Sequence, residues 1–293
     1  MTEPVLRIQS HLTDRDHILL GWLADHGVLT SFQIAHALFP SRDFAQERLR
    51  KLTNLKVLAR FRPQKPDGGS YPYHYVLDQL GVDVVAAQRG DEMPRRDQAR
   101  LRRWHLTNRA NLPHLLGVNQ FFIDLAGYAR THPETNLDRW WPASRCQVAG
   151  AFREPGEDNV MVLAYKAKVR PDGHGIWTER DRQTSFFVEF DTGSEPLWKL
   201  VDKLDGYTAL AKMYRRVWPV LFSLHSAARE RRLHQALSED GVRYPVATAA
   251  RDDTTQPGHS PAEAIWWLHR HDRGLLRLAG LATAVVDSRD EAA

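Results

Sequence analysis

Two carboxylates in the second half of the chain have the types and the surroundings to share a divalent cation. Asp172 lies in the segment Arg170-Pro171-Asp172-Gly173, and Glu189 interrupts the apolar run Phe186-Phe187-Val188-Glu189-Phe190. Such a run is typical of a buried strand, in which an unpaired carboxylate costs several kcal/mol. Glu189 therefore requires a cation, a hydrogen-bond partner or an exposed sheet edge. If a hairpin pairs the two segments, Asp172 and Glu189 meet and could hold Mg²⁺ or Mn²⁺.

The same two residues also have a simpler interpretation. Pro-Asp-Gly is an ordinary turn sequence, so Asp172 could serve only the turn. Glu189 could face an edge of the sheet. Residue chemistry alone leaves both interpretations open.

Composition sets the broad class of the protein. The chain has 293 residues, enough for two modest domains, with 42% hydrophobic and 26% charged residues, as in soluble globular proteins. No run of about 18 apolar residues exists to span a membrane, and no secretory signal opens the chain, so we expect a cytoplasmic protein. The lone cysteine, Cys146, excludes an internal disulfide and a cysteine-rich zinc site.

The first 91 residues have the pattern of a winged helix-turn-helix domain. Thr13 with Asp16, and Thr30 with Gln33, have the spacing of capping boxes before apolar helical runs, and Ser41 caps a third helix over 42–55. Two alternating segments, 57–62 and 71–77, then predict a hairpin around the turn at 64–70. Three helices followed by a hairpin indicate this fold.

The third helix has a polar face suited to reading DNA. Four side chains at i, i+4, i+8 and i+12 share that face, and they include the types that bind guanine and adenine edges. These are Arg42, Gln46, Arg50 and Asn54. Further cations on the helix and the wing could hold phosphates, namely Arg48, Lys51, Arg60, Arg62 and Lys65. The alternatives are a solvated helix face and a winged helix that binds protein.

An Arg-rich segment follows, and we expect residues 92–104 to link two domains. Net charge is +4, and the strongest basic cluster lies here. A solvated tether and a phosphate-contacting arm are both compatible with this composition.

The remaining chain alternates helical and strand patterns. A long helix is expected over 106–131, followed by strands within 138–148, 160–169, 185–191 and 217–224. Helices lie between and after them, so residues 105–286 indicate an α/β domain whose central mixed sheet is flanked by helices. Residues 287–293 are expected to form a disordered tail.

The order of these motifs resembles the replication-relaxation family of actinobacterial plasmids and integrative elements. The resemblance rests on the winged helix, the Arg-rich linker, and three short motifs. These motifs are Asn119-Gln120-Phe121-Phe122, Arg170-Pro171-Asp172-Gly173 and Phe187-Val188-Glu189-Phe190-Asp191-Thr192-Gly193, followed by the segment from Lys199-Leu200 through Tyr207. It implies a role in processing mobile DNA and a C-terminal core like that of restriction endonucleases, the PD-(D/E)xK fold.

Carried over residue by residue, this resemblance places Asp172 and Glu189 at the two metal-binding positions. The position of the catalytic lysine holds Asp191, which cannot stabilise negative charge on a phosphate. Either Asp191 is a third metal ligand, or Lys199 or Lys203 on the next helix supplies the missing cation. The domain is therefore expected either to be an active enzyme of this kind or to have lost catalysis.

Three functions follow as hypotheses. The first is an accessory protein that docks duplex DNA in plasmid replication or conjugative transfer, with a relaxase or replication protein as partner. The second is a Mg²⁺- or Mn²⁺-dependent endonuclease that nicks the selected DNA. The third is a transcriptional regulator whose C-terminal domain makes a homodimer or senses a ligand.

Overall fold

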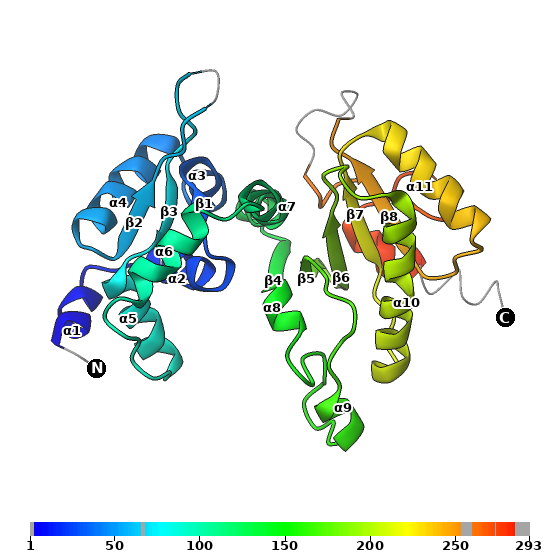
Figure 1. Cartoon of the computed structure of the whole chain (residues 1–293), viewed down its shortest axis with the longest axis horizontal. Helices are drawn as coiled ribbons and strands as arrows, with labels where there is room; N and C mark the ends of the chain where they lie inside the picture. Colours follow the sequence, from blue (N-terminus) through cyan, green and yellow to red (C-terminus); the bar gives the residue numbers. More distant parts are fainter. Residues whose placement is uncertain (1–2, 66–67, 253–259, 273, 285–293) are drawn as a thin grey trace. The chain divides into compact units, whose positions relative to one another are not determined.

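The chain folds into two compact units, Met1–Arg130 and Thr131–Ala293 (Figure 1). The computed structural model describes residues 3–65, 68–252, 260–272 and 274–284. The predicted tail at 287–293 lies outside the described residues, as do the tip of the predicted wing at 66–67 and most of a polar loop. Each unit is described below by itself.

Side-chain caps determine where the first helices begin, as predicted. Helix α2 (Asp14–His26) follows Thr13, whose backbone N–H donates to the Asp16 carboxylate at 2.7 Å. Helix α3 (Ser31–Leu38) follows Thr30, which exchanges two hydrogen bonds with Gln33. Ser41 caps α4 (Arg42–Asn54). These caps pair backbone N–H groups that would otherwise lack partners.

Among the described residues of the N-terminal unit, three strands form an antiparallel sheet in the order β1-β3-β2. They are β1 (Leu29–Thr30), β2 (Leu58–Phe61) and β3 (His74–Leu77). Strand β3 begins at His74, whereas we predicted a start at residue 71. Residues 71–73 include Pro72, which has no backbone N–H to donate to a neighbouring strand. Helices α1 (Glu3–Gln9) and α5 (Gln79–Arg89) complete the part of this unit before the Arg-rich segment.

The Arg-rich segment is partly helical, unlike the linker we expected. Helix α6 (Gln98–Thr107) occupies most of it, and α7 (Leu112–Thr131) starts only after a break, so the predicted helix over 106–131 is wrong at its start. Asn108 ends α6, where its side chain donates to the Trp104 carbonyl at 2.8 Å. Pro113 then lies in the first turn of α7, where its missing N–H costs nothing.

Helix α7 belongs to the N-terminal unit through two hydrogen bonds from polar side chains. Gln33 donates to the Leu116 carbonyl at 3.0 Å, and Asn119 donates to the Val28 carbonyl at 2.8 Å. Both contacts attach α7 to the segment that contains β1. The unit therefore extends to Arg130, whereas we expected the second domain to begin at residue 105.

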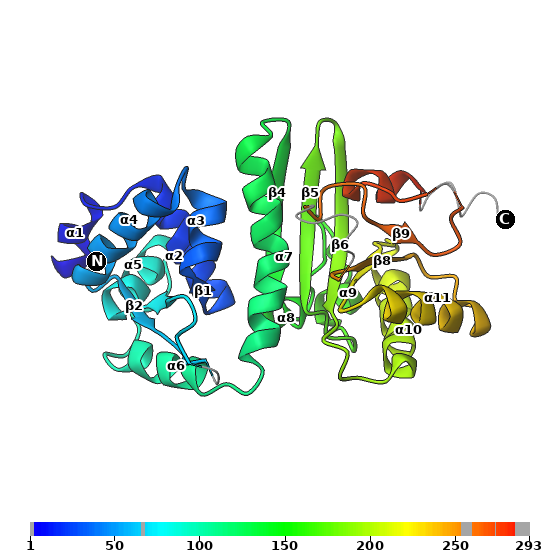
Figure 2. The ribbon, with the colours of Figure 1, turned by 90° about the horizontal axis from the view of Figure 1, so that it is seen from above.

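The C-terminal unit is built on one mixed sheet (Figure 2). In the described part of this unit the sheet has six strands, in the order β4-β5-β6-β7-β8-β9. Strands β6, β7 and β8 run parallel, and the pairs at both ends of the sheet are antiparallel. The strands are β4 (Thr135–Pro142), β5 (Gly173–Glu179), β6 (Arg182–Phe190), β7 (Val220–Leu224), β8 (Val246–Ala250) and β9 (Trp267–Leu268). The predicted α/β class with helices around a central sheet is confirmed.

Two helices make the crossovers between the parallel strands. Helix α10 (Leu197–Tyr214) connects β6 to β7, and α11 (Ala227–Glu239) connects β7 to β8. Both lie on the same side of the sheet (Figure 1), as right-handed crossovers require. The core between them and the sheet includes Phe187, Leu204 and Phe222, all buried. A short 3-10 turn, η1 (Leu278–Gly280), contacts β5 and β6.

Two strand predictions in this unit are corrected. Residues 160–164 form helix α9 (Val160–Ala164), not a strand, because the Asn159 side chain accepts from the Met161 N–H and caps a helical turn. Val160 and Met161 are exposed, so their apolar character does not reflect burial in a sheet. The strand expected within 138–148 ends at Pro142, and α8 (Ala143–Cys146) follows.

Among the described residues, no helix has the length and apolar character needed to cross a membrane.

Gly81 of α5 lies against the backbone that leads into β2. A Cβ atom at position 81 would be 2.2 Å from the Val57 carbonyl oxygen. We expect Gly81→Ala to lower the free energy of unfolding by roughly 1–3 kcal/mol, because backbone must move to relieve the contact. Gly21→Ala is the control: no atom lies within 4 Å of its new methyl, and the α2 helix should gain up to about 1 kcal/mol. Urea denaturation compares them, and equal effects would contradict this packing.

Candidate functional site

The hairpin of β5 and β6 brings Asp172 beside Glu189, as the sequence predicts. Gly173 pairs with Val188, and the Asp172 N–H donates to the Val188 carbonyl at 3.1 Å. The Asp172 carboxylate in turn accepts the Phe190 N–H at 2.9 Å. Asp172 is therefore held at the end of β6, next to the residue that carries the second carboxylate.

Glu189 is buried and bonded to two residues of α10. Its side chain points to the helix side of the sheet, and the residue is only 2% exposed. Lys203 donates to Oε2 at 2.8 Å, and the Tyr207 hydroxyl donates to Oε1. Lys203 and Tyr207 lie four residues apart, so α10 presents both from the same face.

Burial dominates the electrostatics of this cluster. Burial first, and then the neighbouring Asp172 charge, outweigh the lowering effects of Lys203 and Tyr207 and raise the pKa of Glu189 to about 7. Burial opposes the charge on Lys203, but the carboxylates of Glu189, Glu195 and Asp172 outweigh it and raise the Lys203 pKa. Burial and the adjacent Glu189 also hold the pKa of Tyr207 well above its ordinary value. Positive charge is therefore favoured at this site.

The two carboxylates and Lys203 fit the chemistry of a divalent cation site. Mg²⁺ is commonly held by one or two carboxylates and completes its coordination with water and substrate phosphates. Glu189 is buried, so water hydrates its charge poorly, and Asp172 repels it; a cation between them would relieve both costs. Asp172 and Glu189 would be its protein ligands.

The other two predicted site residues lie elsewhere. Lys199, one turn before Lys203, is exposed and lies over its neighbour Trp198, with 5.8 Å between its ammonium and the ring centre. Asp191 is buried, and its carboxylate is bound through both oxygens by Arg229 of α11, at 2.6 and 2.9 Å. Within the described ranges, no group of three histidine, cysteine or acidic residues could hold a metal ion. The candidate site is thus a carboxylate pair with Lys203, and Asp191 belongs to a separate ion pair.

Sequence reasoning missed the residues that frame this site. Tyr207 follows Lys203 at helical spacing, a signal that was available once Lys203 was considered. Arg251, just beyond β8, donates to the Asp191 carbonyl at 2.6 Å and lies 3.9 Å from the Phe190 ring centre. Nothing local in the sequence pairs Arg251 or Arg229 with Asp191, because the contacts join segments 38 and 60 residues apart.

The N-terminal unit carries a second set of predicted residues on α4. Four of them share an exposed face, and Lys51 beside them is also exposed. They are Arg42, Gln46, Arg50 and Asn54. The Arg42 guanidinium lies over the Phe32 ring at 4.6 Å, which limits where this side chain can point.

The cations of the β2–β3 hairpin are ordered by tyrosines. Arg60 and Arg62 both lie over the Tyr73 ring, at 4.1 and 4.9 Å from its centre, and Lys65 lies 5.5 Å from the ring centre of Tyr71. Arg62 also donates to the Tyr71 carbonyl at 2.8 Å. Three positive charges thus lie along one hairpin.

Arg48 is not part of the exposed face of α4. Its Nε donates to the Asp16 carboxylate at 2.9 Å, and its other nitrogen bonds the same carboxylate and the His11 carbonyl. Asp16 is buried, so Arg48 neutralises an internal charge and joins α4 to the start of α2. We therefore remove Arg48 from the set of phosphate-binding candidates.

Comparison with known families places the chain. The family model described as replication-relaxation matches residues 20–221, a span that includes α4, the hairpin and the Asp172, Glu189 and Lys203 cluster. The chain belongs to the replication-relaxation family. Comparisons with curated proteins and with solved structures gave no match.

The raised pKa of Glu189 makes stability depend on pH in a specific direction. In the folded state Glu189 retains its proton up to about pH 7, whereas in the unfolded chain it loses the proton near pH 4.5. The contribution of Glu189 to the free energy of unfolding therefore falls as pH rises between these values. Glu189→Gln removes the titration. We expect the variant to gain about 3 kcal/mol relative to the natural protein between pH 4.5 and pH 8. Urea unfolding at both pH values measures it, and a constant difference would contradict the assignment.

Proposed function

We propose that this protein binds duplex DNA of a plasmid or other mobile element and assists its replication or transfer. Membership of the replication-relaxation family supports the biological role. The N-terminal unit supports the DNA contact. A relaxase or replication protein, and a second copy of the chain, are the partners we expect.

The topology of the N-terminal unit supports a winged helix-turn-helix. Helix α2, strand β1, helices α3 and α4, and the β2–β3 hairpin follow in order, with β1 paired to β3. In this arrangement α4 is the second helix of the helix-turn-helix, the one that enters the major groove in proteins of this class. The hairpin would then be the wing.

The exposed face of α4 carries the proposal. Arginine, glutamine and asparagine can each make two hydrogen bonds to a base edge, and here they follow one another at one-turn intervals. Lys51 on the helix and Arg60, Arg62 and Lys65 on the hairpin would hold phosphates. The cation-π contacts with Tyr73 and Tyr71 restrict these flexible side chains before DNA arrives, which reduces the entropy lost on binding.

Arg50 and Arg48 provide a matched test on one helix. Arg50→Ala should weaken binding to the specific site by about 1–3 kcal/mol and relax base preference, with little loss of stability. Arg48→Ala should instead lower the free energy of unfolding by about 3 kcal/mol, because it leaves the buried Asp16 without its partner. Competition binding and urea unfolding of both variants separate the two roles. Unchanged discrimination in Arg50→Ala would overturn the base-reading role.

A second candidate function is metal-dependent cleavage of the bound DNA. The observation that favours it is the contact of Lys203 with Glu189 beside Asp172. In nucleases of the PD-(D/E)xK type a lysine normally follows the second acidic residue by two positions, where this chain has Asp191. Here the Lys203 ammonium of α10 reaches the Glu189 carboxylate. The positive charge of the catalytic lysine is therefore present although position 191 holds an aspartate.

Each residue would have a defined task in such a reaction. Asp172 and Glu189 would hold the divalent cation, which neutralises phosphate charge and makes bound water a stronger nucleophile. The Lys203 ammonium would stabilise the extra negative charge of the phosphate in the transition state. Tyr207 would keep Glu189 oriented, and Asp172 keeps its own orientation through the Phe190 N–H.

Supercoiled DNA from the genetic neighbourhood tests this activity directly. We expect nicking with Mg²⁺ or Mn²⁺ and none with EDTA, and we expect Asp172→Ala and Glu189→Ala to abolish it. The two lysines can be distinguished: Lys203→Ala should slow nicking by about 100-fold or more, whereas Lys199→Ala should leave it near the natural rate. Binding without cleavage under every condition would exclude this second function and leave the first intact.

A further inference from the structure

Helix α6 and the residues just before it form the most basic segment of the N-terminal unit, and neither proposed site uses it. Residues 95–109 contain six arginines and a single acidic residue, Asp97. Arg103 has a distant contact with Asp78, 3.9 Å away. In the part of the chain that the structure describes, Arg95 and Arg109 have no acidic partner. Unneutralised charge at this density favours a polyanionic ligand.

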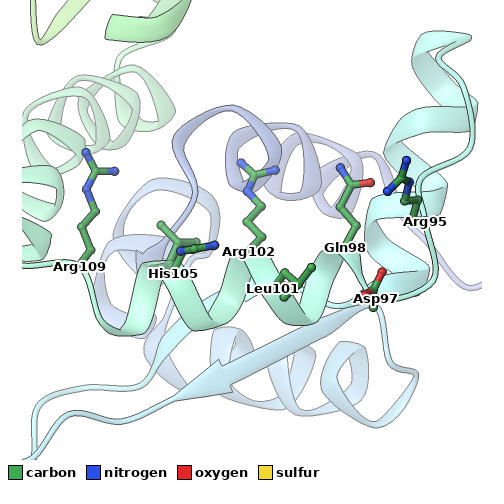
Figure 3. Close-up of a pocket in the computed structure, with 8 residues that line it drawn as sticks. Arg95, Asp97, Gln98, Leu101, Arg102, His105 and Arg109 are labelled. Carbon is green, nitrogen blue, oxygen red and sulfur yellow. The ribbon is translucent and has the colours of Figure 1, made fainter.

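Three polar side chains of α6 share one face, and together with Arg109 just after the helix they border a hollow. Gln98, Arg102, His105 and Arg109 follow at i, i+4, i+7 and i+11, and Figure 3 shows them in a row along one side, with Arg95 ahead of the helix start. The hollow has a volume of about 530 Å³. The 10 residues of α6 rise about 15 Å, long enough to contact more than one phosphate of a nucleic acid.

Two exposed apolar side chains lie on α6 to the side of the polar face that borders the hollow. Trp104 is 62% exposed and Leu101 50% exposed. Trp104 lies edge-on to His105, with ring centres 5.1 Å apart, and most of its side chain remains exposed to a ligand. Proteins that bind single strands combine a basic track for the backbone with exposed aromatic rings on which bases stack. In duplex DNA each base is stacked between its neighbours, so no base face is free to stack on an exposed indole.

We propose that α6 and the residues flanking it bind single-stranded DNA, with phosphates at Arg95, Arg102 and Arg109 and a base stacked on Trp104 at the side of the helix. This site lies on a different helix from α4, and it does not rest on the duplex-binding proposal or on cleavage. It gives the N-terminal unit a means of holding DNA that has been opened. An acidic protein is the alternative ligand for a basic surface with an exposed tryptophan. The oligo(dT) experiment below distinguishes these two ligands.

Trp104 and Trp198 allow a matched experiment. Both are tryptophans of similar exposure, 62% and 64%, on helices of different units. Fluorescence anisotropy of a labelled oligo(dT) of about 20 nucleotides, with the full chain, measures affinity. We expect Trp104→Ala to weaken single-strand binding by about 5- to 100-fold and Trp198→Ala to leave it unchanged. A hairpin duplex of the same length should lose little affinity in Trp104→Ala.

The salt dependence of oligo(dT) binding tests the cations. Arg95→Gln with Arg109→Gln should reduce the slope of log affinity against log salt by about 1.4, because each phosphate contact to a single strand contributes about 0.7. Arg102 is left in place, since it also donates to the Ala24 carbonyl. The double variant Arg231→Gln, Arg232→Gln on α11 removes the same charge from exposed positions and should leave the slope unchanged.

Three results would overturn the proposal, provided that circular dichroism shows the variants folded. One is an absence of oligo(dT) binding, as a surface for an acidic protein would give. The second is equal loss of single-strand and duplex affinity in Trp104→Ala, which would make α6 part of the duplex site. The third is a salt slope that the α6 and α11 variants reduce equally. Loss of duplex binding in Arg50→Ala with normal oligo(dT) binding would leave this inference standing.

Discussion

The C-terminal unit depends on a carboxylate that it buries. Glu189 lies at the end of a central strand, where an uncompensated charge would cost several kcal/mol. Lys203 and Tyr207 offset part of this cost, and this requirement fixes the rotation of α10 about its axis. With that rotation set, the neighbouring residues Leu200 and Leu204 pack against the sheet. The same contacts that stabilise the fold therefore place an ammonium group beside two carboxylates.

Buried carboxylates are also paired with a cation next to the candidate site and in the N-terminal unit. Asp191 is bound by Arg229, and Asp16 by Arg48, so each buried carboxylate near a helix has one arginine that reaches it from another element. Arginines used in this way cannot also bind a ligand. The remaining exposed side chains of α4, and Arg95 and Arg109 on either side of α6, are those free to meet DNA. Burial, more than residue type, separates structural cations from candidate binding residues.

Local signals in the sequence predicted the features that local interactions determine. The caps at Thr13, Thr30 and Ser41 lie where expected, because each needs only three or four consecutive residues. The strand around Glu189 and its approach to Asp172 followed from a short apolar run and a turn. The α/β class followed from the order of such segments.

Predictions failed where distant contacts decide the outcome. Arg48 has the same helical neighbourhood as Arg50, and only the position of Asp16, 32 residues away, distinguishes them. Residues 160–164 have strand-like composition, but no sheet strand pairs with them in the described structure, and the Asn159 cap makes a helix. The Lys203 contact with Glu189 was one of several arrangements that the sequence allowed, since it depends on how α10 packs.

The most direct test of the central claim is a crystal structure of the full chain grown with Mn²⁺, with data collected at the manganese absorption edge. We predict an anomalous peak between Asp172 and Glu189, with carboxylate oxygens about 2.1 Å from the ion and Lys203 displaced from its direct bond to Glu189. An empty site at saturating Mn²⁺, with the Lys203 and Tyr207 bonds to Glu189 intact, would contradict it. The cluster would then be a structural ion pair, and the protein's interaction with DNA would rest on its N-terminal unit.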